Sequence, residues 1–195
     1  MKTIAAILIA VSFSILIIAL LQKNSNYMNV SEVITKHFST FTDAPIQFCA
    51  VFLVPAFLSI ASVLADAVND NLMENLLVAV SIFFSVFFAV MSILCSMTTD
   101  EPSTRPEARN TLINETFICA MFESIISVIV LVLLIGYQLL SLPDSWGKSL
   151  LQGVILYFVF LVITNMFVII KRLQKLFSGI QETDSEKTIP DRKNR

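Results

Sequence analysis

Charged side chains are scarce in this sequence of 195 residues. Asp, Glu, Lys and Arg together make up 14% of it, against about 25% in a typical soluble domain. Hydrophobic residues make up 56%, and the mean hydropathy is +0.80. So few charges cannot give this much apolar surface a polar exterior, which excludes an ordinary soluble globular domain. The low counts of four Gly and six Pro exclude collagen-like and Gly/Pro-rich disordered chains.

A strong charge of one sign is also lacking, and so are the motifs of common catalytic sites. The net charge is −2, so no overall basic field favours nucleic acid, and we expect no direct nucleic-acid binding. The sequence contains no H-E-x-x-H, G-x-S-x-G or glycine-rich phosphate-binding motif. The only histidine, His37, has no Cys or second His nearby, and it is predicted to be a surface residue rather than a metal ligand. We therefore expect no enzymatic activity, no catalytic residues, no cofactor and no metal.

Cysteine is rare as well. The three cysteines, Cys49, Cys95 and Cys119, all fall within apolar stretches. An odd number of cysteines at membrane depth does not favour a disulfide framework. We interpret them as small apolar residues of the protein core.

What the sequence does contain is five long apolar runs. They cover residues 3–21, 44–65, 75–99, 116–142 and 149–170. A helix needs about 20 apolar residues to cross a hydrocarbon layer of roughly 30 Å, and backbone polar groups in lipid must be satisfied within the helix. The sequence therefore predicts an all-α, multi-span helical integral membrane protein with four to five transmembrane helices. Residues 1–171 form the transmembrane domain in this interpretation, and residues 172–195 form a tail.

Basic residues concentrate at the C-terminal end of the chain. Seven of the 13 Lys and Arg residues lie there, and Lys171, Arg172 and Lys175 directly follow the last apolar run as a basic anchor. By the positive-inside rule this end is cytoplasmic. We expect the last helix to continue past these residues to a left-handed cap at Gly179. Residues 181–195 are of mixed charge and are predicted to be disordered.

The loops follow from this orientation. Alternating sides back from a cytoplasmic C-terminus places residues 141–148 and 66–74 outside. The connection that carries Arg105 and Arg109 is then inside. This assignment is consistent with the distribution of Lys and Arg among the three loops.

The location of the N-terminus stays open at this point. Five spans would put Met1 outside, with residues 3–21 as an uncleaved signal-anchor helix. Four spans would put both termini inside and leave residues 44–65, with Pro55 in the middle, as a re-entrant or interfacial element. Proline is tolerated in membrane helices, so Pro55 does not decide between the two.

One ionisable residue, Glu123, lies well inside an apolar run. It is eight residues past Glu115, about 12 Å along a helix, and an intramembrane charge is a functional hypothesis by default. Asn165 lies at a similar depth, six residues before Lys171. We predict a polar contact between Glu123 and Asn165 on adjacent antiparallel helices. Structural support of that kind, ion coupling or gating, and extension of the Glu123 side chain to the interface are the alternatives.

Small residues recur at helical spacing in two of the runs. A spacing of four places small residues on one helix face, and helices in lipid associate through such faces. We predict helix packing in a homo-oligomer through these faces, with pore lining by the serines as the alternative. The two sets are Ala6, Ala10 and Ser14 in the first run, and Ser81, Ser85, Ala89, Ser92 and Ser96 in the third.

The overall layout resembles one known family. A membrane protein of this length, nearly all of it in apolar spans, with the basic helix end Lys171-Arg172-Leu173-Gln174-Lys175, looks like the KwaA family, the membrane subunit of the Kiwa anti-phage defence system. The resemblance implies a four-helix homo-oligomer with a cytoplasmic, DNA-binding KwaB-like partner. The five apolar runs depart from that count, and no functional residue is carried over.

These observations favour a non-enzymatic sensor or anchor subunit in the bacterial inner membrane. It would contact membrane lipid, assemble as a homo-oligomer and recruit a cytoplasmic protein partner, with a role in anti-phage defence implied by the resemblance. A holin-like or channel-forming protein is the first alternative. A small carrier that uses Glu123 is the second.

Overall fold

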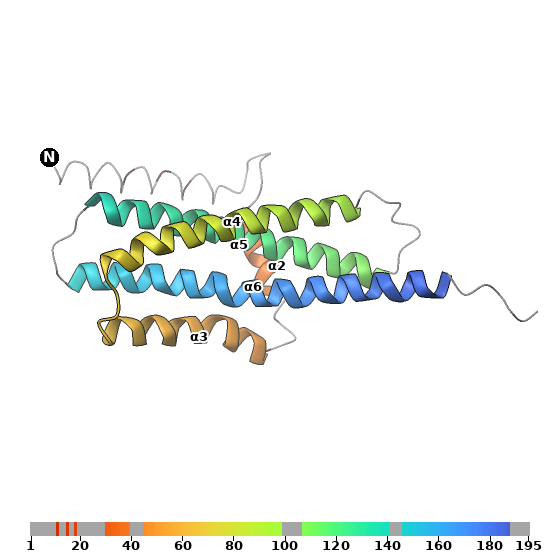
Figure 1. Cartoon of the computed structure of the whole chain (residues 1–195), viewed down its shortest axis with the longest axis horizontal. Helices are drawn as coiled ribbons and strands as arrows, with labels where there is room; N and C mark the ends of the chain where they lie inside the picture. Colours follow the sequence, from red (N-terminus) through yellow and green to blue (C-terminus); the bar gives the residue numbers. More distant parts are fainter. Residues whose placement is uncertain are drawn as a thin grey trace, which may run out of the picture.

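The computed structural model describes residues 11, 15, 18, 30–39, 45–98, 107–140 and 146–187. Within these ranges the chain is helical and contains no strand, so the predicted all-α class is confirmed. Most of the first apolar run, including Ala6, Ala10 and Ser14, lies outside the described residues. The elements are α2 (Val30–Ser39), α3 (Pro45–Leu64), α4 (Asp70–Thr98), α5 (Glu107–Leu140) and α6 (Trp146–Lys187), arranged as Figure 1 shows.

Four of the described helices are long and apolar enough to cross a membrane. The run over residues 44–65 forms one of them, the 20-residue helix α3, which is about 30 Å long and matches the hydrocarbon layer. Pro55 lies inside α3 and is buried there. The length of α3 favours a complete span over the re-entrant alternative. The four stretches are Pro45–Leu64, Asp70–Met97, Arg109–Leu140 and Trp146–Ser178.

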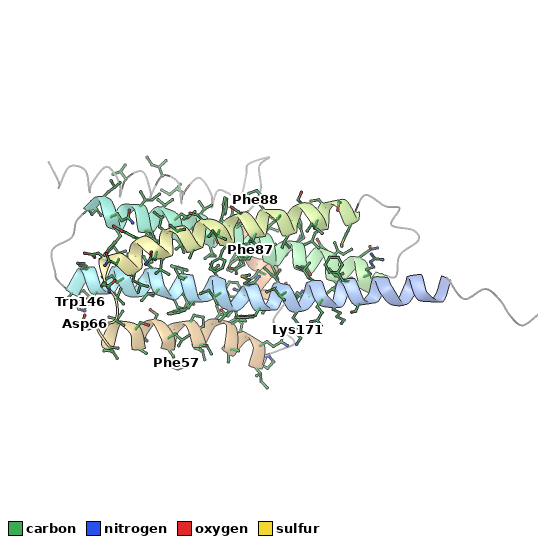
Figure 2. The ribbon with its side chains drawn as sticks, viewed as in Figure 1. Phe57, Asp66, Phe87, Phe88, Trp146 and Lys171 are labelled. Atoms are coloured by element: carbon green, nitrogen blue, oxygen red, sulfur yellow. The ribbon has the colours of Figure 1, made fainter. Side chains whose placement is uncertain are left out.

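The core lies along α5, which packs against α4 on one side and α6 on the other. On α4, four buried residues recur every seven positions, and none is more than 1% exposed: Met73, Val80, Phe87 and Leu94. A seven-residue repeat is the period of left-handed coiled-coil packing. Figure 2 shows the consequence for two adjacent rings, since Phe87 points into the bundle and Phe88 points away. Phe88 is 53% exposed.

The same repeat continues on α5 with alternating steps of four and three. Its buried positions include three polar residues, Thr116, Glu123 and Ser127, next to apolar ones such as Val130 and Leu134. The sequence analysis predicts packing through the small-residue spacing on the opposite side of α4 and does not include this heptad pattern. The seam between α4, α5 and α6 is therefore apolar in most layers and polar in a few.

Helix α3 packs along α6 at the edge of the bundle (Figure 1). Val51 and Leu161 form the small core between the two helices, and the Ser59 hydroxyl donates to the Gly153 carbonyl at 2.6 Å. The outer face of α3 remains apolar and open, with Phe57 68% exposed and Leu64 81% exposed. Exposed apolar side chains on a spanning helix are expected where lipid, rather than water, surrounds it.

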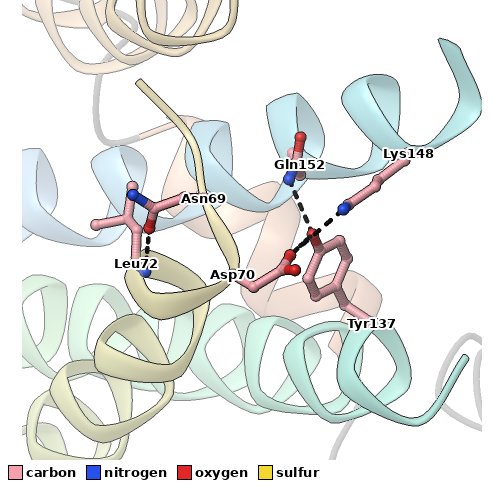
Figure 3. Close-up of polar contacts among 6 residues, drawn as sticks. All are labelled: Asn69, Asp70, Leu72, Tyr137, Lys148 and Gln152. Atoms are coloured by element: carbon pink, nitrogen blue, oxygen red, sulfur yellow. Dashed lines mark hydrogen bonds and ion pairs between the residues drawn. The ribbon is translucent and has the colours of Figure 1, made fainter. Parts of the chain in front are cut away.

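The turn between α3 and α4 is closed by paired caps. The Asp66 and Ala67 N–H groups donate to the carbonyls of Val63 and Ser62, both at 3.1 Å, which is the bonding pattern of a Schellman motif. Asp66 accordingly has a φ of 50°, a left-handed conformation that usually belongs to glycine. On the other side of the turn, the Asn69 side chain accepts the Leu72 N–H at 2.8 Å and caps α4 (Figure 3).

The end of α6 differs from the sequence-based expectation. The helix continues through Gly179 to Lys187, so the predicted cap at Gly179 is wrong, and residues 181–187 are helical rather than disordered. A glycine within a helix costs only about 1 kcal/mol relative to alanine. The residues after it include the helix-favouring Gln181, Glu182 and Glu186, which offset that cost. Residues 188–195 lie outside the described part of the chain.

Replacing Asp66 with glycine is predicted to stabilise the protein. Glycine adopts the left-handed conformation without the steric cost that any other L-residue carries there. We expect a gain of about 1 kcal/mol, or roughly 2–4 °C in the melting temperature of the purified protein in mild detergent. Asp66→Val is the matched control and should lower the melting temperature, because a β-branched side chain opposes this conformation. A lower melting temperature for Asp66→Gly would contradict this account of the turn.

Candidate functional site

An ion pair sets the height at which α5 and α6 pass one another. The Arg172 Nη1 atom donates to Glu115 Oε2 at 2.7 Å. The two side chains are 17% and 38% exposed, as expected at a boundary between apolar and polar surroundings. The contacts of Arg172 thus differ from those of the other two residues of the predicted basic anchor. Lys171 and Lys175 are exposed and have no carboxylate partner in the described part of the chain.

Glu123 and Asn165 come to the same height because of this register. Glu123 is eight residues on from Glu115 along α5, and Asn165 is seven residues back from Arg172 along α6, steps of about 12 and 10 Å. The exposed fractions are 0% for Glu123 and 1% for Asn165, and the Asn165 side chain adjoins the Glu123 carboxyl. Both residues are therefore buried at the same level of the bundle, between α5 and α6.

The direct hydrogen bond expected between them does not form in this conformation. Both Glu123 oxygens and both polar atoms of the Asn165 side chain are buried without a hydrogen-bonding partner among the described residues, and so is the Ser127 hydroxyl one turn along α5. Buried polar atoms are nearly always satisfied, and leaving one unsatisfied costs about 1–3 kcal/mol. The centre of the seam is thus a polar pocket of the core with unused hydrogen-bonding capacity.

His37 lies beside this layer, contrary to the sequence-based expectation. It was predicted to be a surface residue, but it is fully buried because α2 packs on α5 through Val33 and His37. Its ring stacks on Phe122 with the centroids 3.9 Å apart and the planes at 9°. Burial, with a smaller contribution from the Arg172 charge, lowers the pKa of His37 to about 4, so the ring is neutral at pH 7.

The described residues hold no group of three or more His, Cys, Asp or Glu side chains placed to bind a metal ion. None of the three cysteines is in a disulfide, as the sequence predicted. Cys119 is buried in the core, whereas Cys49 and Cys95 are exposed on α3 and α4, so the core interpretation holds for Cys119 alone.

A second polar cluster ties the helices together at the opposite end of the bundle (Figure 3). The Tyr137 hydroxyl donates to Asp70 Oδ1 at 2.6 Å, and Gln152 Nε2 donates to the Tyr137 oxygen at 2.8 Å. Lys148 Nζ lies 3.5 Å from the same Asp70 oxygen. Asp70, Tyr137 and Gln152 come from α4, α5 and α6, so one cluster joins three helices. It was missed in the sequence, where its only signal is that each residue lies near the end of an apolar run.

The small-residue face of α4 lies on the outside of the bundle. Ser81, Ser85, Ala89, Ser92 and Ser96 are all exposed. The hydroxyls of Ser81 and Ser85 donate to carbonyls of their own helix, those of Leu77 and Ser81, at 2.8 and 3.0 Å. This α4 face is therefore not part of the core formed by the described helices, and its predicted role between chains stays a prediction.

Comparisons with known proteins do not assign a family. No protein-family model matches the chain, and no curated protein or solved structure matches it either. The candidate site is thus defined by its own geometry, as polar clusters at the two ends and in the middle of the seam.

A double-mutant cycle tests the Glu123–Asn165 contact. Glu123→Leu and Asn165→Leu should each lower the melting temperature in detergent, because each removes the polar side chain that adjoins the other, and the one that remains is then surrounded by apolar groups. The double variant should recover most of the loss, since it removes both polar groups. Glu123→Gln is the matched control and should stay close to the parent, because the amide keeps the shape and a hydrogen-bonding group. Losses that simply add in the double variant would show that the two residues do not interact.

Proposed function

We propose that this chain is a non-enzymatic sensor or anchor subunit of a membrane, which assembles with copies of itself and recruits a protein partner to its C-terminal helix. The observation that carries the proposal is the length of α6. It spans 42 residues and projects beyond the ends of α3, α4 and α5 (Figure 1). A helix that only had to cross the bilayer would need about half that length.

The projecting part of α6 begins where its packing against the bundle ends. Leu176 is buried in a cluster with Leu94 and Ile113, whereas Phe177 directly after it is 46% exposed. The twelve residues from Leu176 to Lys187 extend for about 18 Å. Their sequence passes from apolar to acidic, with Glu182, Asp184 and Glu186 near the end. Such a helix offers a partner both an apolar anchor and charges.

The continuity of α6 also supports a sensing role. The same helix contacts α3 and α5 within the membrane-spanning part and carries Gln152 of one end cluster and Arg172 of the other. A change in how α6 packs in the membrane would therefore move the projecting end, because the helix is unbroken between them. The positive-inside rule favours the cytoplasm for this end.

Site-specific cross-linking tests partner recruitment. A photo-reactive amino acid at Phe177 should form one discrete cross-link in intact cells, which disappears when the chain is ended after Ser178 while the protein remains in the membrane. The matched control is the same amino acid at Phe57, which is 68% exposed on the outer face of α3 and should contact lipid. Absence of a protein cross-link at Phe177 and Gln181, or equal cross-linking at Phe57, would contradict the proposal.

Assembly with copies of itself is supported by the exposed small-residue face of α4. Small residues let helix backbones approach closely, which is the main source of helix association where lipid removes the hydrophobic driving force. This face lies opposite the buried heptad positions of α4 and is exposed. We propose that a second copy packs on it.

The α4 face yields a direct prediction. Ser85→Leu should lower the oligomeric state seen by native mass spectrometry in mild detergent, and Ser85→Leu with Ala89→Leu should lower it further, because the larger side chains separate the backbones. Ala61→Leu is the matched control on the exposed side of α3 and should leave the oligomer unchanged. An unchanged oligomer in the double variant would refute the role of this face.

A channel-forming, holin-like function is the second candidate. It is favoured by the four hydroxyls of the α4 face, Ser81, Ser85, Ser92 and Ser96, which could line a pore between copies. Reconstituted protein should then conduct ions, and Ser85→Leu should reduce the current. A carrier that uses Glu123 would instead lose transport in Glu123→Gln with assembly intact.

Placement in the bacterial inner membrane and a role in anti-phage defence are supported only by the layout resemblance to the KwaA family.

A further inference from the structure

A cavity opens between α3, α5 and α6 near the level at which α3 begins. Its volume is about 630 Å³, within the range of roughly 300–1,000 Å³ typical of small-ligand sites. Gln47 of α3, Glu115 of α5 and Lys171 of α6 all line it. Figure 2 shows Lys171 on α6 near the N-terminal end of α3. Since α3 has the length of one bilayer crossing, this level corresponds to the membrane boundary.

The polar end of the cavity carries an excess of positive charge. Lys171, Arg172 and Lys175 line it together with a single carboxylate, Glu115. Arg172 is paired with Glu115, so two of the three positive charges remain uncompensated by the described residues. Lys171 and Lys175 are four residues apart, and such residues are neighbours on one helix face, with Cβ atoms about 5–6 Å apart. Two ammonium groups at that spacing can contact one phosphate.

The other end of the cavity is apolar and faces away from the polar boundary. Phe167 lies four residues before Lys171 on α6, about 6 Å deeper, and Val54 lies seven residues after Gln47 on α3. Both line the cavity, and they are 67% and 44% exposed, so this end opens on the lipid-facing surface. The cavity is therefore basic at the membrane boundary and apolar toward the bilayer centre.

We propose that this cavity binds an anionic phospholipid, with its phosphate on Lys171 and Lys175 and an acyl chain along Phe167 and Val54. Basic pockets between membrane helices are a recognised way to hold anionic lipid head groups, and a ligand with a charged head and an apolar chain matches both ends of the cavity. A soluble phosphate compound shares the head-group chemistry but would leave the apolar end unused. The site does not depend on the cytoplasmic partner proposed above.

Fluorescence quenching can test the site, because the chain has one tryptophan, Trp146, on the far end of α6. The variant Trp146→Phe/Phe167→Trp moves the single indole to the cavity wall. In vesicles of phosphatidylcholine with a minor fraction of phosphatidylglycerol, brominated acyl chains on either lipid report its occupancy of the site. We expect phosphatidylglycerol to be preferred over phosphatidylcholine, by roughly fivefold for each lysine.

Substitutions of the two lysines separate charge recognition from general effects. Lys171→Gln/Lys175→Gln should reduce the preference to about one, whereas Lys171→Arg/Lys175→Arg should keep it. Lys36→Gln, on the exposed side of α2, is the control for a lost charge outside the cavity and should leave it unchanged. As a check without the moved indole, phosphatidylglycerol should raise the melting temperature of the parent chain in detergent more than that of the double Gln variant.

Three results would overturn the proposal. The first is an equal affinity for the two lipids in the variant with the moved indole. The second is a preference that survives Lys171→Gln/Lys175→Gln. The third is displacement of the brominated lipid by millimolar glycerol phosphate or inorganic phosphate, which would assign the cavity to a soluble phosphate ligand.

Discussion

The Arg172–Glu115 ion pair fixes how far α5 and α6 slide past one another, and the remaining polar contacts of the seam depend on that register. With it in place, Glu123 meets Asn165 and Tyr137 meets Gln152. Because the pair is partly exposed, it adds little to the free energy of unfolding. Its importance lies in aligning the two helices. A shift of either helix by one turn would separate all of these partners together. The register is thus specified by polar groups, in a bundle whose apolar layers would tolerate sliding.

The two faces of α4 differ in what they contact. Phe87 and Leu94 belong to the buried seven-residue repeat that packs on α5, while Ser85 and Ala89 lie on the exposed side. In water an exposed face of this kind would need charges. In a bilayer it needs only to fit either lipid or another helix, so small residues become the informative ones.

Helix α6 connects the features for which we propose functions. It carries the lysines of the cavity, the ion pair to α5 and, from Leu176 on, the projecting segment. Lys175 lines the cavity only one residue before that segment leaves the bundle. An anionic lipid on the lysines and a protein on the projecting helix would therefore occupy adjacent parts of one rigid element, which gives lipid composition a physical route to the partner-binding surface.

The sequence by itself determined the class of fold, the positions of the four described apolar helices and the matching heights of Glu123 and Asn165 along α5 and α6. These follow from one-dimensional quantities: the length of an apolar run, and the rise of a helix counted from a boundary residue such as Lys171. The C-terminal limit of α6 did not follow, because Gly179 is compatible with both a cap and a helix interior, and the residues after it favoured the helix.

Only the tertiary structure decided which side chains meet. His37 is buried because α2 folds back onto α5, and a short amphipathic helix does not reveal its partner. Asp70, Tyr137 and Gln152 belong to three helices, and Lys171 differs from Arg172 only because Glu115 lies beside one of them. Contacts between distant segments depend on rotation and register, which the pattern along each helix leaves undetermined, since an isolated helix in lipid can turn about its axis and slide without losing a backbone hydrogen bond.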